Sequence, residues 1–233
     1  QNLENFKETI KKTIEFSPDR ICLNYLHVSP KFHPHQLKMP KDMLPDEVKR
    51  KELFKLAEEF LLNNNYIRAG YDHFVKNNDY LAEEIKKNQA SWNRLGIVTG
   101  KYTNTIGAGV SATCKIEGKL YYQNCFENNV YEDRLSKDLL PITKYHSLSK
   151  DDQIREKIIK DIRLFFSIDK KSIIDEYQIN FDEYFRDEIN SLKLFFDENL
   201  IENTSEDLKI TKQGEVFSNL IASKFDNYLN KVN

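Results

Sequence analysis

Four of the five histidines and one aspartate are the residues whose types and spacing could support chemistry. His27, His33 and His35 fall close together in the chain, and Asp72 directly precedes His73. Imidazole is a common metal ligand, so a metal site is one interpretation of this group. His33 and His35 flank a proline, however, and this spacing is not a strong ligand motif. We therefore favour surface or hydrogen-bonded histidines over a metal site.

The Asp72–His73 pair has two interpretations that the sequence leaves open. The two residues could form an acid–base pair, or contact a ribose and a carboxylate, at the end of a strand. Equally, Asp72 could cap a turn while His73 is a core histidine with its hydrogen bonds satisfied.

The segment Gly96 to Gly118 contains five of the seven glycines of the chain. In a chain so poor in glycine, this clustering indicates a backbone that needs positive φ or that something approaches closely. Neither of the common glycine-rich phosphate-binding motifs is present. Ligand binding is therefore weighed against a tight crossing of a strand and a helix.

Composition excludes several classes of function. The formal net charge of −2 gives no general attraction to nucleic acid or to an anionic membrane. No run of 18 apolar residues predicts a membrane span. Three cysteines without C-x-x-C spacing fit a reducing cytoplasm and exclude a local zinc or iron–sulfur motif. The first residues lack the features of a signal peptide and an initiating Met, so we expect a chain cut from something longer.

Hydrophobic periodicity predicts alternating helices and strands in the first part of the chain. We expect helices over residues 3–16, 46–64 and 79–87, and strands over 20–28, 66–74 and 120–124. The apolar character of residues 20–28 predicts a strand buried on both faces. Residues 29–45 carry four prolines and predict an irregular loop.

From residue 149 the pattern becomes mainly helical. We expect helices over 150–165, 170–178, 182–196 and 212–230, with a hairpin at 200–202 and 208–210, which resembles a winged helix. Residues 150–233 contain 13 Lys or Arg against 18 Asp or Glu. This excess of acidic residues would repel phosphates, so we reject DNA binding and favour a packing or lid domain.

A series of short motifs resembles those of one enzyme family, in the same order over essentially the whole chain. The matching segments are Pro18-Asp19-Arg20, Pro34-His35-Gln36, Gly70-Tyr71-Asp72-His73-Phe74, Asp79-x-Leu81-Ala82, Gly107-x-Gly109-Val110-Ser111-Ala112, Tyr122-Gln123-Asn124, Asp151-Asp152-x-Ile154-Arg155, Phe181-x-x-Tyr184-Phe185, Thr211-x-x-Gly214 and Phe225-Asp226-x-Tyr228-Leu229. They resemble the C-terminal half of an oxygen-independent coproporphyrinogen III oxidase, a radical S-adenosylmethionine (SAM) enzyme of haem biosynthesis.

The resemblance implies an α/β fold in two domains. Residues 1–145 would be the C-terminal part of a radical SAM partial α/β barrel with its cavity-lining loops, and residues 146–233 a small helical winged-helix-like domain that covers the cavity. The implied cofactors are SAM and a 4Fe-4S cluster, and the implied reaction is oxidative decarboxylation of porphyrinogen propionates. The C-x-x-x-C-x-x-C cluster motif is absent from this sequence, so we expect an N-terminal radical SAM half as its partner. A cytoplasmic location, a tetrapyrrole substrate, and no nucleic-acid or membrane partner complete the expectation.

The resemblance also implies site residues. Gly107, Gly109 and Ala112 would line the cofactor and substrate cavity, with Asp72 and His73 at its rim.

Three cofactor positions depart from the family pattern. Leu95 stands where the family has a glutamine, Thr113 stands where it has an isoleucine, and a contact near the end of the first strand falls on Leu26 or His27. These substitutions indicate either a divergent enzyme or a relative that handles a different tetrapyrrole. The alternative from another class is a non-catalytic haem-binding or assembly module, motivated by the missing cluster ligands and by Leu95 and Thr113.

Overall fold

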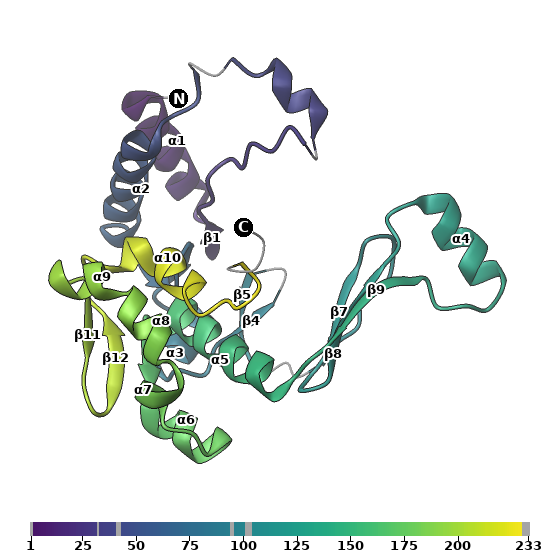
Figure 1. Cartoon of the computed structure of the whole chain (residues 1–233). Helices are drawn as coiled ribbons and strands as arrows, with labels where there is room; N and C mark the ends of the chain where they lie inside the picture. The colour runs from purple at the N-terminus through teal and green to yellow at the C-terminus, as the bar shows by residue number, and fades with distance from the viewer. Residues whose placement is uncertain (1, 32, 41–42, 94–95, 101–103, 230–233) are drawn as a thin grey trace. The chain divides into compact units, whose positions relative to one another are not determined.

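The computed structural model describes residues 2–31, 33–40, 43–93, 96–100 and 104–229. The chain divides by its contacts into two compact units, Gln1–Asn88 and Gln89–Asn233 (Figure 1). The domain boundary expected at residue 145 came from the family resemblance, whereas this division comes from contacts within the chain. The expected boundary stays a prediction. None of the helices described is long and apolar enough to cross a membrane.

The first unit packs helices against a small sheet. Its elements are α1 (Leu3–Phe16), β1 (Arg20–Cys22), the 3-10 helix η1 (Pro34–Lys38), α2 (Glu47–Leu62), β2 (Tyr66–Ala69), β3 (His73–Lys76) and α3 (Tyr80–Lys86). The strands are ordered β1-β3-β2, and both pairings are antiparallel. The apolar side of α2 packs on the sheet through Phe54, Leu61, Tyr66 and Phe74. The helix predicted over 3–16 is confirmed, and the other two agree within two residues.

Two strand predictions in this unit are wrong in extent. The strand expected over 20–28 ends at Cys22, because its ladder to β3 ends at the pair Cys22–His73. Residues 24–27 are exposed rather than buried on both faces. The strand expected over 66–74 is a hairpin, in which Gly70 takes a φ of 66° at the turn between β2 and β3. A positive φ suits glycine, since it has no Cβ to clash with the backbone.

The second unit begins with strands. These are β4 (Ser91–Asn93), β5 (Gly96–Val98), β6 (Asn104–Thr105), β7 (Thr113–Ile116), β8 (Leu120–Asn124) and β9 (Ile142–Ser147), with α4 (Asn128–Ser136) between the last two. β4 pairs with β5, and β6-β7-β8-β9 form an antiparallel sheet. Gly118, with a φ of 62°, allows the tight turn between β7 and β8. The strand predicted over 120–124 is confirmed.

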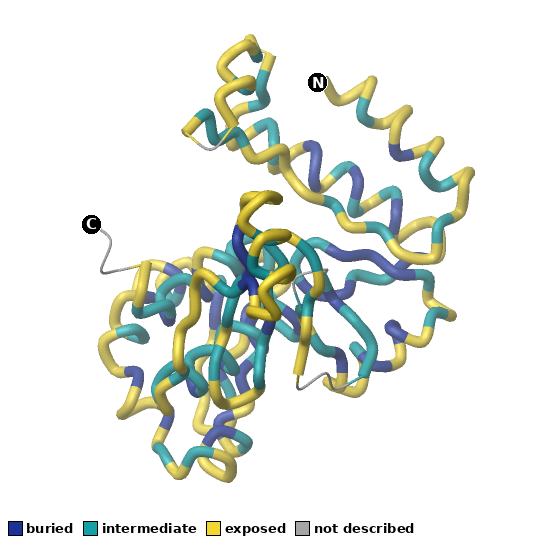
Figure 2. The backbone as a smooth tube through the Cα atoms, turned by 90° about the vertical axis from the view of Figure 1, so that its right-hand side faces the viewer, coloured by how far each residue is buried: buried dark blue, intermediate teal, exposed yellow. Residues whose placement is uncertain are grey.

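A helical part follows in the second unit. Its elements are α5 (Lys150–Phe165), β10 (Ser167–Asp169), α6 (Lys170–Tyr177), α7 (Phe181–Tyr184), α8 (Arg186–Ser191), α9 (Lys193–Asp197), β11 (Ile201–Asn203), β12 (Asp207–Ile210), η3 (Glu215–Phe217) and α10 (Ser218–Ser223). Its core collects the apolar side of α5, including Ile154, Ile158 and Ile162, which recur at helical spacing. Buried positions recur among half-buried ones along α5. Figure 2 shows the buried, intermediate and exposed residues along the described backbone.

The helical part confirms some predictions and corrects two. The helix predicted over 150–165 and the hairpin are confirmed, as α5 and as β11 with β12. The helix expected over 182–196 is three short helices, because the backbone leaves helical geometry at Phe185 and Leu192. The helix expected over 212–230 is reduced to η3 and α10, since a turn in which the Gly214 N–H donates to the Thr211 carbonyl precedes them.

Candidate functional site

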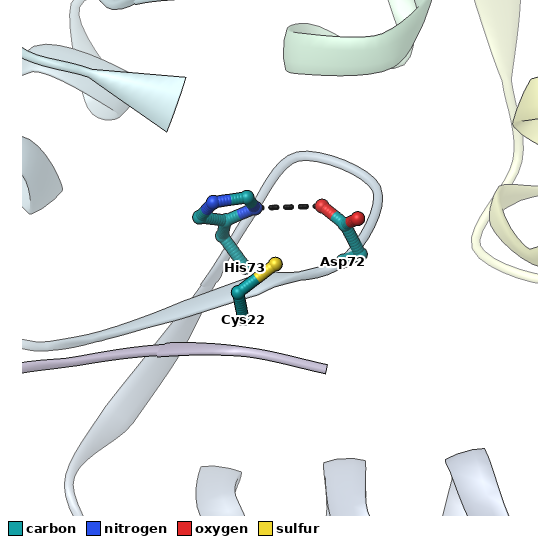
Figure 3. Close-up of side chains that lie close together, drawn as sticks. All are labelled: Cys22, Asp72 and His73. Atoms are coloured by element: carbon teal, nitrogen blue, oxygen red, sulfur yellow. Dashed lines mark hydrogen bonds and ion pairs between the residues drawn. The ribbon is translucent and has the colours of Figure 1, made fainter. Parts of the chain in front are cut away.

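Asp72 and His73 lie beside Cys22 in the first unit (Figure 3). The antiparallel register of β1 and β3 places Cys22 opposite His73, and Asp72 lies in the preceding turn. His73 Nδ1 lies 2.6 Å from Asp72 Oδ1, and His73 is 8% exposed. Each interpretation of this pair therefore has one feature in the structure. Asp72 lies in a turn, and its carboxylate is hydrogen-bonded to the buried imidazole of His73.

Arg68 holds the turn that carries Asp72. Its Nε donates to the Gly70 carbonyl at 3.1 Å, and one Nη donates to the Tyr71 carbonyl at 2.9 Å. The other Nη donates to Glu58 at 3.0 Å, so the buried guanidinium has a carboxylate partner. These contacts fix the backbone on the N-terminal side of Asp72.

Cys22, Asp72 and His73 could supply three metal-ligand atoms, which all lie within 4.8 Å of one another. A tetrahedral zinc site needs ligand atoms roughly 3.3 Å or more apart, given metal–ligand distances of about 2.0–2.3 Å. The 2.6 Å between His73 and Asp72 is a hydrogen bond, shorter than that separation. Burial, with Asp72 nearby, raises the pKa of the Cys22 thiol and disfavours the thiolate that a metal needs. The spacing of these atoms is therefore that of a hydrogen-bonded pair rather than that of a tetrahedral metal site.

The other predicted residues of the first unit do not join this group. Leu26 is 58% exposed and His27 is exposed, and the His27 carbonyl accepts a hydrogen bond from Gln36 at 3.2 Å. The rings of His33 and His35 lie 5.9 Å apart near η1. Among the residues described, the structure does not gather the histidines into one ligand set. Leu95 lies outside the described residues.

Residues 106–112, within the predicted segment Gly96 to Gly118, connect β6 to β7 in the second unit, and we call them the glycine loop. A Cβ on Gly107 would lie 2.9 Å from Ala112 Cβ and 3.1 Å from the Thr113 carbonyl, so this glycine permits a close crossing of the loop on itself. Gly109 differs, because a Cβ built there would meet nothing within 4 Å, while its φ is 102°. The two glycines thus serve different needs, close packing at Gly107 and positive φ at Gly109.

Polar groups hold the loop from several elements. The Gly109 N–H donates to the Tyr131 hydroxyl of α4 at 3.0 Å, and Asn124 donates to the Gly109 carbonyl at 2.9 Å. The Ser111 N–H donates to the Cys125 carbonyl at 2.7 Å. The loop is therefore pre-shaped before any ligand arrives, and Gly109 faces open space.

A cavity of about 570 Å³ lies in the second unit, and among the described residues Thr113 is the one predicted site residue that lines it. Its other lining residues come from the strands β4, β6, β7, β8 and β9, from α5, and from Glu117, Leu148 and residues 226–228. Lys115 and Tyr121 converge there on Glu156, each with its donor atom 2.5 Å from Glu156 Oε1. The cavity is large enough for a small organic ligand.

Electrostatic coupling dominates this cavity. Burial, with Glu156 accepting its hydrogen bond, raises the pKa of Tyr121 and keeps the phenol protonated. Burial alone would lower the pKa of Lys115, but hydrogen bonds to Glu117 and Glu156 raise it instead. Lys115 is therefore a permanent cation whose charge is balanced by two carboxylates.

A second polar group lies at the N-terminal end of α5. Tyr228 donates to Asp152 at 2.8 Å, and its hydroxyl lies 3.0 Å from His146 Nε2. Burial by itself would raise the pKa of Asp152, but hydrogen bonds from the Ser149 side chain and backbone, Tyr228 and His146 lower it to about 2.

No motif in the sequence indicated that α5 contributes to this cavity. Lys115 and Glu156 lie 41 positions apart, and no local motif links them. A usable signal was the spacing of charged residues along α5, since Asp152, Glu156, Lys160 and Arg163 recur every three or four positions. That spacing puts them along one side of a helix.

Comparison with known proteins gives consistent relatives. Residues 148–217 match the HemN C-terminal domain family. The chain is 30% identical over 234 residues to the oxygen-independent coproporphyrinogen III oxidase of a Synechocystis species, with 98% of this chain and 50% of the relative covered. The Escherichia coli K12 enzyme of the same name is 28% identical over 230 residues, with the same coverage.

A solved structure matches the fold over nearly the whole chain. It is the one titled "Coproporphyrinogen III oxidase (HemN) from Escherichia coli is a Radical SAM enzyme", with a TM-score of 0.91 and 28% identity over 98% of this chain and 52% of that one. The chain is a relative of the C-terminal half of the oxygen-independent coproporphyrinogen III oxidases. The resemblance seen in the motif series is confirmed, and so is the α/β fold of the C-terminal part of a radical SAM enzyme.

The chain spans about half the length of the curated relatives it matches. A 4Fe-4S cluster of the kind a radical SAM enzyme carries does not fit the cysteines of this chain. Its three cysteines lack the C-x-x-x-C-x-x-C spacing, and two of them, Cys114 and Cys125, are buried. Ligands for a cluster would have to come from elsewhere.

Proposed function

We propose that this chain is the C-terminal part of a radical SAM enzyme that oxidatively decarboxylates propionate groups of coproporphyrinogen III. The observation that carries the proposal is the joint match in sequence and fold over 98% of the chain. The proposed whole protein includes a further N-terminal half, which supplies the cluster that starts radical chemistry with SAM.

The two sites of this chain would have separate roles in that reaction. The pre-shaped loop from Gly107 to Thr113 would line the cofactor and substrate cavity, which the open space over Gly109 supports. Asp72 and His73 would stand at the substrate rim. Their 2.6 Å hydrogen bond supports a role in orienting a proton donor or acceptor toward a polar substrate group.

The experiment is an anaerobic assay of the whole protein encoded by the gene. The protein, with its cluster reconstituted, is incubated with SAM, a reductant and coproporphyrinogen III, and the tetrapyrrole products are separated by chromatography and mass spectrometry. We expect products that have lost carboxyl groups and gained vinyl groups. Formation of deoxyadenosine without any vinyl product would contradict the proposed substrate.

A further inference from the structure

Two of the cations that line the cavity of the second unit are already neutralised by carboxylates. Lys115 lies 2.7 Å from Glu117 and 2.5 Å from Glu156. Arg155 lies 2.8 Å from Asp151 and 2.8 Å from Glu188. The charges of Lys115 and Arg155 are therefore already offset by two carboxylates each.

Lys160 and Arg163 also line the cavity, and neither makes a hydrogen bond or an ion pair in the described part of the chain. They lie three positions apart on α5, where side chains are neighbours and like charges repel. Arg163 lies in the last turn of α5, where a cation complements the helix dipole. That explains a preference for a cation, but it supplies no acceptor for the guanidinium N–H groups.

Trp92 provides an aromatic surface beside Arg163. The Arg163 guanidinium carbon lies 4.5 Å from the centre of the Trp92 ring, which is a cation–π arrangement. Arg163 Nε is buried without a partner, so the stack has already removed one donor from water. Trp92 is 44% exposed and lines the cavity from β4. Two cations and an indole together suit a ligand that carries carboxylates on a flat, apolar body.

We propose that Lys160, Arg163 and Trp92 bind the carboxylate-bearing edge of a tetrapyrrole, with the two cations on a propionate and the indole against a pyrrole ring. The identity of the ligand rests on the proposed function, whereas the case for an anion comes from Lys160 and Arg163, which form no ion pair in the described part of the chain. Glu156 and Asp152, two carboxylates of the lining, already accept hydrogen bonds from Lys115, Tyr121 and Tyr228.

The test uses the 233-residue chain and coproporphyrin III, the air-stable oxidised form, as the probe. Binding is followed by the anisotropy of porphyrin fluorescence, and by quenching of the emission of Trp92, the single tryptophan of the chain. We expect saturable binding that weakens as salt is raised, since salt screens charge pairs. Lys160→Gln and Arg163→Gln should each weaken binding about tenfold, as the loss of a charge-assisted hydrogen bond implies.

The control is Lys171→Gln, which removes an exposed lysine of α6 outside the cavity and should leave the affinity unchanged. Arg163→Lys keeps the charge and should recover part of the affinity, which separates charge loss from misfolding. Circular dichroism of each variant checks the fold.

Several outcomes overturn the inference. These are no binding of coproporphyrin III, binding that Lys160→Gln and Arg163→Gln leave unchanged, or binding of SAM instead of the porphyrin at the same residues. If the chain fails this binding test but the whole protein forms vinyl product, the proposed function stands and only the binding residues are wrong. Porphyrin binding that depends on Lys160 and Arg163, without vinyl product from the whole protein, would support the inference and contradict the proposed reaction.

Discussion

At the scale of single residues, Gly107 and Gly109 show that neighbouring glycines can answer different needs. Gly107 is required by distance, because Ala112 and the Thr113 carbonyl occupy the space of a Cβ. Gly109 is required by conformation, because its φ is 102° although the space around it is open. Only the second position keeps the loop open to approach from outside.

Gly107→Ala should destabilise the second unit by about 1–3 kcal/mol, the usual cost of overpacking. The atoms it would meet are a backbone carbonyl and a Cβ, which cannot swing aside. Urea unfolding measures the change. Ala108→Ser, at an exposed neighbouring position, is the control and should change stability by less than about 0.5 kcal/mol. Equal stability of Gly107→Ala and the unmodified chain would show that the loop is not packed as described.

At the scale of elements, α5 connects the core to the cavity. Its apolar side, with Ile154, Ile158 and Ile162, packs in the core, while Glu156, Lys160 and Arg163 line the cavity. A capping box starts the helix: Ser149 Oγ accepts from the Asp152 N–H, and Asp152 accepts from the Ser149 N–H. Stabilisation of this helix end therefore also positions the cavity residues.

The capping box makes the stability of the chain depend on pH. Asp152 has a pKa of about 2 in the folded chain against 3.8 as its ordinary value. Its stabilising contribution is therefore complete above pH 3.8 and is lost as the pH falls toward 2. Asp152→Asn should destabilise the chain at pH 6, and this difference should shrink between about pH 5 and pH 2.

Urea unfolding of both chains across this pH range measures the effect. Ser149→Ala removes one donor to Asp152 and should cost about 1 kcal/mol at neutral pH. Ser149→Ala should also reduce the pH-dependent part of the free energy of unfolding, because Asp152 loses one of its hydrogen-bond donors. A difference between Asp152→Asn and the unmodified chain that stays constant down to pH 2 would contradict the role given to Asp152.

At the scale of the whole molecule, the candidate residues fall into two compact units. Asp72 and His73 belong to Gln1–Asn88, whereas the glycine loop and the cavity belong to Gln89–Asn233. The second unit contains every residue that the tetrapyrrole inference needs.

A fragment of residues 89–233 should therefore fold by itself and bind coproporphyrin III with an affinity within about threefold of the full chain. Its own core, built from α5, α10 and the β10-β12-β11 sheet, is the physical reason. Thermal unfolding followed by circular dichroism should show one cooperative transition, and porphyrin anisotropy gives the affinity. Residues 1–88 provide the matched control and should not bind. A folded second unit without affinity would place the porphyrin contacts elsewhere.

The sequence by itself determined the long helices, the β8 strand and the family, because periodicity and ordered motifs are local features of the chain. It also indicated the importance of the glycine loop. It could not place Lys115 on Glu156 or Arg163 on Trp92, since these partners lie far apart along the chain. Only the tertiary structure decided that strand 20–28 stops at Cys22, because the length of a ladder depends on its partner strand. It also decided which charges of the cavity are neutralised, because that depends on distances between elements, and Lys160 and Arg163 were thereby distinguished from the other cations.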